Sequence, residues 1–257
     1  MINPLYSLAG VFVGILVGLT GVGGGSLMTP LLVLVFGFHP VTAVGTDLLY
    51  ASATKTAGTA VHGWRGTVDW RVVRRLATGS VPATLLTLLA LSYATKRSED
   101  TGSTIATVLG GALILTAIAI FFRQRIVDAL APSFRTIDER RIAALTVLLG
   151  AILGVLVSLT SVGAGALGMT ALLVLYPRLP ISRLVGSDIA HAVPLTLIAG
   201  IGHWSMGGVD FSLLLSLLVG SIPGIIIGSL IASRVSDKVL TPILAVTLAL
   251  VGAKLLF

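Results

Sequence analysis

The sequence predicts an all-α integral membrane protein built from two inverted-topology repeats of about five segments each. Composition predicts the class, since 55% of the 257 residues are hydrophobic, 11% are charged and the mean hydropathy is +1.04, values outside the usual range of soluble chains. We expect helices, because lipid offers the backbone no hydrogen-bond partner and strand-type alternation is absent. An internal duplication and the placement of basic residues predict the repeats and their orientation.

The duplication relates the two halves of the chain at a nearly constant offset. Residues 18–25 match residues 158–165 at a shift of 140, and after one inserted residue, Gly168, the match continues at a shift of 141. At that shift Val44-Gly45-Thr46-Asp47 lies over Val185-Gly186-Ser187-Asp188, and Gly79-Ser80-Val81-Pro82 over Gly220-Ser221-Ile222-Pro223. Duplicated apolar segments that glycine interrupts at matching places are typical of secondary transporters, whose site lies at the repeat interface.

Ten apolar segments follow in order, five in each half. They cover residues 4–20, 26–38, 42–62, 71–94 and 103–122, then 142–159, 165–177, 182–204, 210–233 and 238–257. The second segment of each half is short of the ~20 residues that cross a bilayer, so we expect it to be short, broken or re-entrant. Thr29 before Pro30 has the chemistry of a helix start. The predicted division is repeat 1 over 1–122, a linker over 123–141 and repeat 2 over 142–257.

Basic residues predict the orientation of these segments. An odd number of segments per half inverts the second half relative to the first. With the N-terminus outside, thirteen Lys and Arg residues fall on the cytoplasmic side, and only Lys96, Arg97 and Lys254 fall outside. Because basic residues accumulate in cytoplasmic loops, we expect both termini outside a cell inner membrane and the 123–141 linker in the cytoplasm.

Several classes of function are not expected. The chain has no cysteine, which excludes disulfides and thiolate metal sites. Its net charge of +7 is spread over loops and forms no stripe, so nucleic acid is not an expected partner. No motif supplies the nucleophile and base of an enzyme, and none implies a cofactor. The expected partners are the bilayer and a small substrate, with monomer and homodimer both open.

Three ionisable residues inside predicted membrane segments are candidates for function, because each costs about 2.5–3.5 kcal/mol there. Asp47 and Asp188 are repeat equivalents. They are either paired carboxylates that govern proton coupling or site geometry, or N-caps of helices that begin later. Lys55 aligns with the neutral Thr196. It is either a charge partner for an anion or an interfacial lysine whose ammonium snorkels. Because Lys55 follows Asp47 by eight residues on the same helix, we do not expect a direct ion pair between them.

Three histidines lie in the same predicted segments. His191 follows Asp188 by three residues and therefore shares its helix face, where it either tunes that carboxylate or packs with a hydrogen bond. His62 and His203 align with each other near Trp64 and Trp204. A histidine close to tryptophan at a segment end is typical of an interfacial anchor.

The glycine runs predict the binding site. Residues 21–26 resemble a phosphate loop only superficially, because no lysine follows the glycines. Within a membrane, such a run indicates an unwound stretch that lines a cavity, with free N–H groups and a positive helix end facing an anion; close packing through small residues is the alternative. We expect substrate contacts from Thr20, Gly23, Gly24, Gly25, Ser26, Thr29, Lys55, Thr160, Gly163, Ala164, Gly165 and Thr170, with Asp47, Asp188 and His191 in coupling or site geometry.

The glycine-rich first segment, the Val44-Gly45-Thr46-Asp47 motif, the Arg65-Gly66-Thr67-Val68-Asp69-Trp70 loop and Gly79-Ser80-Val81-Pro82 resemble the sulfite exporter TauE/SafE family. This resemblance implies a bacterial or archaeal inner-membrane transporter that exports sulfite or small organosulfonates by alternating access. The alternative is a cation or metal transporter that uses the intramembrane Asp and His residues. It predicts that Asp47, Asp188, His62, His191 and His203 converge on one point.

Overall fold

The computed structural model describes residues 3–20, 25–64, 66–97, 101–231 and 237–256, and all regular structure in these ranges is helical. This confirms the predicted all-α class. The helices are α1 (Pro4–Thr20), α2 (Gly25–Leu34), α3 (Pro40–Trp64), α4 (Trp70–Arg97), α5 (Thr101–Phe121), α6 (Arg123–Phe134), α7 (Glu139–Thr160), α8 (Ala166–Leu175), α9 (Ile181–Ser205), α10 (Phe211–Ile231) and α11 (Asp237–Leu256). The polar stretch at 123–141 contains a helix, α6, that the sequence analysis did not anticipate.

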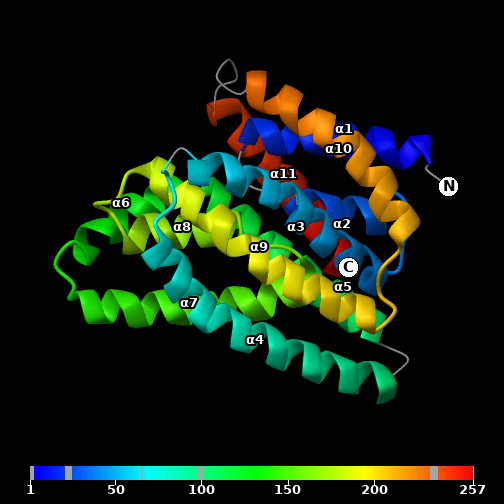
Figure 1. Ribbon diagram of the computed structural model, residues 1–257, viewed down its shortest axis with the longest axis horizontal. Coiled ribbons are helices and arrows are strands. Elements are labelled where there is room, and N and C mark those ends of the chain that lie inside the picture. Colours follow the sequence, from blue (N-terminus) through cyan, green and yellow to red (C-terminus); the bar gives the residue numbers. More distant parts are fainter. Residues whose placement is uncertain (1–2, 21–24, 65, 98–100, 232–236, 257) are drawn as a thin grey trace.

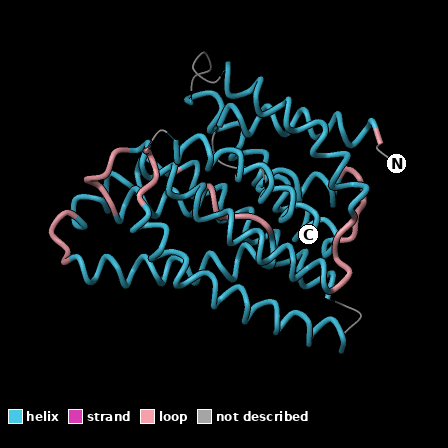
Figure 2. The backbone as a smooth tube through the Cα atoms, in the orientation of Figure 1, coloured by secondary structure: helices cyan, strands magenta, loops and turns pink. Residues whose placement is uncertain are grey.

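The most closely packed helix pairs are α1 with α10, α4 with α7, α5 with α11 and α3 with α9. Helices α1 and α10 pack side by side along one edge of the molecule, α4 and α7 along the opposite edge, and α3 packs against α9 between them (Figure 1). Most of the loops gather at the two ends of the long axis (Figure 2). The longest helices therefore run between the same two ends, which is the arrangement of a membrane bundle.

The outer faces of the edge helices are apolar. On α7, Leu145, Leu148, Ile152 and Val155 follow one another at helical spacing and are 37–55% exposed. Apolar faces of this length are rare on soluble monomers. Among the described residues, four helical stretches are long and apolar enough to cross a membrane: Trp70–Ala94, Ser103–Phe121, Glu139–Thr160 and Ile181–Ser205. The chain is a multi-pass membrane protein.

Helices α2 and α8 are ten residues long each. At 1.5 Å per residue they extend about 15 Å, roughly half of the hydrocarbon thickness. Helix α2 begins at Gly25, so Thr29 and Pro30 lie inside it and the helix start predicted at these two residues is wrong. Gly25, the last glycine of the run, is the first residue of α2. The Thr29 hydroxyl donates to the Asp47 carboxyl group on α3 and does not cap a backbone N–H.

The edge helices approach each other through glycine. A Cβ atom added to Gly150 on α7 would overlap the carbonyl oxygen of Leu76 on α4, and one added to Gly10 on α1 would overlap the carbonyl oxygen of Leu217 on α10. Gly10 and Gly150 are equivalent in the duplication, as are Leu76 and Leu217. Small residues allow this backbone proximity in membranes.

Hydrogen bonds between the halves follow the same reciprocal pattern. The Thr46 hydroxyl on α3 accepts from the backbone N–H of Asp210 at 3.1 Å, and the Ser187 hydroxyl on α9 accepts from the backbone N–H of Asp69 at 2.8 Å. Residues 46 and 69 correspond to 187 and 210 at the shift of 141. Each half thus fastens the loop of the other with an equivalent hydroxyl.

Candidate functional site

Two buried carboxyl groups lie on the central helices. Asp47 is 0% and Asp188 5% exposed. Helices α3 and α9 begin at Pro40 and Ile181, so each acid lies about two turns inside its helix. The alternative that these acids are N-caps is therefore wrong, because their own N–H groups and those that follow already belong to the helix.

The carboxyl group of Asp47 connects three elements. The Thr29 hydroxyl on α2 donates to Asp47 Oδ2 at 2.5 Å, and the Ser161 side chain, just after α7, lies near the same carboxyl group. Neither Asp47 Oδ1 nor Ser161 Oγ has a hydrogen-bond partner in the described part of the chain. Buried polar atoms are normally satisfied, so this pair marks a polar place with unused hydrogen-bonding capacity.

Asp188 occupies a different environment although it is the repeat equivalent. A Cβ atom on Gly168 would lie 2.7 Å from Asp188 Oδ1, so the carboxylate packs against the first turn of α8, and Oδ1 has no hydrogen-bond partner among the described residues. Thr170, the equivalent of Thr29, donates to the Ala166 carbonyl at 2.8 Å instead. The inserted Gly168 lets the acid approach the helix directly and breaks the symmetry.

Lys55 is a charged residue that interacts with both acids. Its side chain is half-buried on α3 and interacts electrostatically with Asp188 and with Asp47. As expected from the helix spacing, it forms no ion pair within 4.0 Å with any described carboxylate. Lys55 therefore balances part of the negative charge of the two acids without a direct ion pair.

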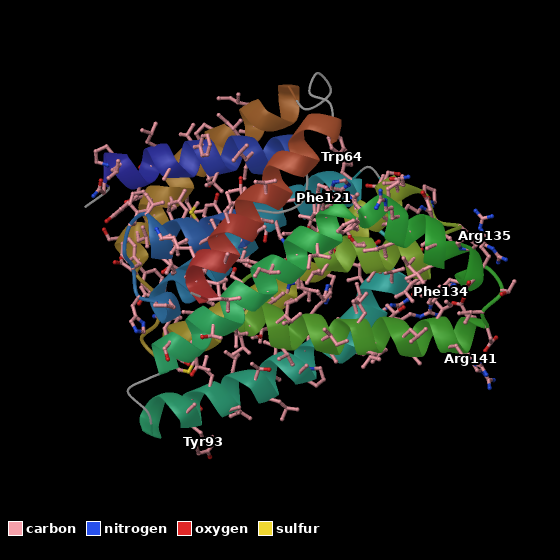
Figure 3. All side chains as sticks on the ribbon, turned by 180° about the vertical axis from the view of Figure 1, so that it is seen from behind. Trp64, Tyr93, Phe121, Phe134, Arg135 and Arg141 are labelled. Atoms are coloured by element: carbon pink, nitrogen blue, oxygen red, sulfur yellow. The ribbon has the colours of Figure 1, made fainter. Side chains whose placement is uncertain are left out.

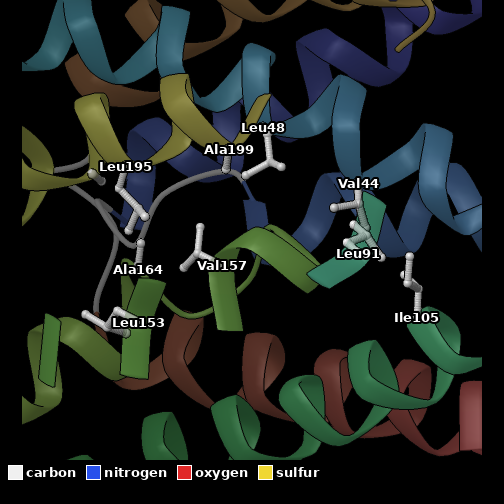
Figure 4. Packing of buried hydrophobic residues seen from close by; sticks show 10 residues of the cluster. Val44, Leu48, Leu91, Ile105, Leu153, Val157, Ala164, Leu195 and Ala199 are labelled. Carbon is white, nitrogen blue, oxygen red and sulfur yellow. The ribbon is translucent and has the colours of Figure 1, made fainter. Parts of the chain in front are cut away.

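The break between α7 and α8 lies next to both acids. Ser161 and Gly163 have φ values of 60° and 113°, so the chain turns sharply there. Ala164 is 3% exposed and packs with Leu153, Val157 and Leu195 (Figure 4). Within the described residues, the N–H groups of Gly163, Ala164 and Gly165 donate to no acceptor. Unpaired N–H groups in a buried place are rare, and at a helix start they suit an oxyanion.

The predicted hydroxyl ligands are already engaged. Thr160 donates to the Leu156 carbonyl at 2.6 Å and accepts from the Val162 N–H at 3.1 Å, and Thr29 and Thr170 donate as described above. Among the described residues, the donors left available at this break are the backbone N–H groups of residues 163–165, the Ser161 hydroxyl and Lys55. In the first half, Gly23 and Gly24 lie outside the described residues, as do the side chains of Thr20 and Ser26, while Gly25 begins α2.

His191 contacts a serine that the sequence analysis did not select as a site residue. Its Nε2 atom is 2.8 Å from Ser80 Oγ on α4, and its Nδ1 atom has no partner among the described residues. The equivalent pair in the other half, Tyr50 and Ser221, also lies together. Both serines belong to the duplicated Gly-Ser-x-Pro motif, and their polarity inside apolar segments is the signal that could have identified them.

The remaining histidines have structural partners. His203 is fully buried, and its Nε2 atom is 2.8 Å from the Ser158 carbonyl at the end of α7. Its interpretation as an interfacial anchor is wrong, because that carbonyl holds it in the interior. His62 Nδ1 is 2.9 Å from Thr67 Oγ1. Among the described residues, no three His, Asp or Glu side chains come close enough to hold a metal ion, so the convergence expected of a metal transporter is not seen there.

The sequence matches the sulfite exporter TauE/SafE family over residues 6–255. It is 42% identical over 209 residues to the probable membrane transporter protein YjnA of Bacillus subtilis, covering 80% of this chain and 81% of that protein. It is 27% identical to the probable membrane transporter protein YdhB of the same organism, covering 79% of each chain. A probable membrane transporter protein of Xylella fastidiosa is 29% identical over 80% of this chain and 76% of its own. No solved structure is significantly similar.

The apolar bundle, its broken half-length helices and these relatives define a multi-pass helical membrane transporter. More specifically, the chain belongs to the sulfite exporter TauE/SafE family.

Proposed function

We propose that this protein is a secondary transporter that exports a small sulfur-containing oxyanion, sulfite or an organosulfonate, across the cell inner membrane. The observation that carries the proposal is the group of N–H donors at Gly163, Ala164 and Gly165, which have no acceptor within the described ranges and belong to the break whose Ser161 lies near Asp47. The family name supports sulfur oxyanions as the substrate class.

The donors suit the shape and charge of such an anion. Several backbone N–H groups converge at the start of α8, where the helix dipole also favours negative charge. The Lys55 ammonium adds a full charge, and charge-assisted hydrogen bonds are about twice as strong as neutral ones. The carboxyl group of Asp47 lies near Ser161, at the start of the same break, so an oxyanion bound at the break would come close to this acid.

Charge balance supports proton coupling. Lys55 and two ionised acids carry a net charge of −1, and a bound monoanion makes it −2 in a membrane interior where each charge costs about 2.5–3.5 kcal/mol. A proton on Asp47 or Asp188 relieves this repulsion. We therefore propose that the oxyanion moves together with protonation of this acid pair. His191, three residues after Asp188 and 2.8 Å from Ser80, sets the site geometry.

The reciprocal glycine contacts and hydroxyl bonds support two structural repeats over 1–122 and 142–257, joined by the 123–141 linker. Five membrane segments in each half make these repeats inverted, with both termini outside and α6 in the cytoplasm. Alternating access then follows from one half rocking against the other. In the duplicated sequence, the glycine run at 21–25 corresponds to residues 161–165.

Flux measurements test this proposal. We expect purified protein in liposomes to move ³⁵S-sulfite or a sulfonate, and Lys55→Ala to lower the flux at least tenfold because the cation that faces the anion is lost. Lys254→Ala is the matched control, since Lys254 is exposed in the last turn of α11. Equal flux in both variants, or no flux of any sulfur oxyanion by the parent protein, contradicts the proposal.

A further inference from the structure

A second site of positive charge lies outside the membrane core. A cavity of about 210 Å³ opens between the start of α4, the start of α7 and the loop that follows α8. Arg71, Arg75, Arg135 and Arg178 line it, and we call it the arginine pocket. Figure 3 shows Phe134, Arg135 and Arg141 at one end of the molecule and Tyr93 toward the other. In the orientation proposed above, the pocket faces the cytoplasm.

The two acids in the pocket do not neutralise it. Arg75 donates to Glu139 at 2.6 Å and to the Tyr176 hydroxyl at 3.3 Å, which uses the Glu139 charge. The Asp69 carboxylate accepts from the backbone N–H of Arg71 at 3.0 Å and thereby caps α4.

The other arginines keep donors to spare. Arg178 uses one nitrogen on the Arg135 carbonyl at 2.7 Å, and a guanidinium has five N–H donors. Among the described residues, no carboxylate lies within 4.0 Å of Arg135 or Arg178, and Arg71 reaches Glu139 only at 4.0 Å. Three guanidinium groups therefore remain for a ligand.

The residues around the arginine pocket differ from their equivalents in the duplication. At the shift of 140 or 141, Thr146, Pro177 and Leu179 correspond to Tyr6, Phe36 and Phe38. In the first half these three rings pack edge to face, with centroid distances of 5.1 and 5.7 Å from Tyr6. The place of Arg75 is taken by Ser216. Aromatic rings therefore pack at one end of the bundle, whereas arginines line a cavity at the other end. The repeated fold does not by itself require the pocket.

A second cavity adjoins the first. It has a volume of about 340 Å³ and shares Arg135, Tyr176, Pro177 and Leu179 with the arginine pocket. Its other lining is mainly apolar, including Leu173, Val127, Ile181 and Leu184. A ligand that occupies both cavities has an anionic head and an apolar body, since apolar walls with a few convergent polar groups are typical of small-molecule sites.

We propose that the arginine pocket binds the oxyanionic head of an amphiphilic anion, whose short apolar tail enters the adjoining cavity. The oxyanion is either that of a free organosulfonate collected before transport or the phosphate of an anionic lipid. Guanidinium groups bind both bidentately. The collecting role rests on the proposed function, whereas binding of the oxyanion does not.

Binding of butanesulfonate to the purified full-length protein tests the pocket. The double variant Arg71→Gln, Arg135→Gln removes two guanidinium groups and keeps the Arg135 carbonyl that holds Arg178. The matched control is Arg74→Gln, Arg141→Gln. These two arginines lie at the same end of the molecule, on α4 and α7, but do not line the pocket. We expect at least tenfold weaker binding in the first variant and unchanged binding in the second. We also expect methanesulfonate to bind more weakly than butanesulfonate, by up to about fourfold per methylene.

A lipid arm identifies the source of the oxyanion. If butanesulfonate does not bind, while phosphatidylglycerol raises the melting temperature of the parent protein and the control but not of the pocket variant, the pocket holds a lipid phosphate. Equal behaviour of the pocket variant and the control toward both probes overturns the proposal. Flux is measured in parallel, so that a pocket that binds in a protein without sulfite flux contradicts only the proposed transport function.

Discussion

Replacing Gly150 by alanine tests the close packing of α4 on α7. The new Cβ atom would overlap the Leu76 carbonyl oxygen and lie 3.0 Å from Leu76 Cα. Carbon atoms pack best at about 3.5–4.0 Å, so the helices would have to separate by roughly 0.5–1 Å. Gly111 on α5 is the control, because a Cβ atom there meets nothing within 4 Å.

The magnitude follows from two opposing effects. Overpacking costs about 1–3 kcal/mol, and alanine recovers about 0.5–1 kcal/mol of helix propensity. We expect Gly150→Ala to lower the free energy of unfolding by up to about 2.5 kcal/mol, and Gly111→Ala to raise it by up to about 1 kcal/mol. At about 2–4 °C per kcal/mol for a chain of this size, the first variant melts up to about 10 °C lower. Thermal unfolding in detergent, followed by size-exclusion chromatography, measures the difference. Equal melting temperatures for both variants refute the packing argument.

Three further perturbations test the site and the topology. Thr29→Val removes the hydroxyl that donates to Asp47 and is expected to lower the free energy of unfolding by about 1–3 kcal/mol. Thr170→Val is the control and should cost less, because the Thr170 hydroxyl bonds a carbonyl of its own helix. Equal losses in thermal unfolding argue against the Asp47 contact. Gly168→Ala places a Cβ atom 2.7 Å from Asp188 Oδ1 and is expected to lower sulfite flux in liposomes severalfold. The control Gly111→Ala should leave the flux unchanged. Normal flux in both variants removes Asp188 from the proposed mechanism. Thr136→Cys adds a cysteine to a chain that has none, and an impermeant maleimide should label it only from the cytoplasmic side; labelling of intact cells from outside reverses the proposed orientation.

The positions of most helices could be predicted from the length of the apolar segments and the spacing of the repeats. The segments predicted at 42–62 and 182–204 correspond to α3 and α9, and the short segments at 26–38 and 165–177 to α2 and α8. Helix α6 was missed because its arginines and its length resemble a polar loop. The start of α2 was misplaced because Thr29-Pro30 has capping chemistry, while the true use of Thr29 depends on Asp47 across the interface.

The site was predictable as a region but not as a set of contacts. Glycine runs and intramembrane charges are visible in the chain itself and led to the prediction of Gly163, Lys55 and Asp188 as site residues. The partners of these residues come from other helices. Ser80 beside His191 and Ser161 beside Asp47 emerge only when α4 packs on α9 and the break folds against α3. A side chain's hydrogen-bond partner is decided by tertiary packing, which periodicity does not encode.

The most direct measurement is a structure determined with selenite, the heavier congener of sulfite, whose selenium atom is located by anomalous scattering. We expect one selenium peak within hydrogen-bonding reach of the N–H groups of Gly163, Ala164 and Gly165 and beside the Lys55 ammonium. A site that stays empty at selenite concentrations that inhibit sulfite flux, or a peak bound elsewhere in the membrane core, contradicts the central claim that this break binds the transported oxyanion.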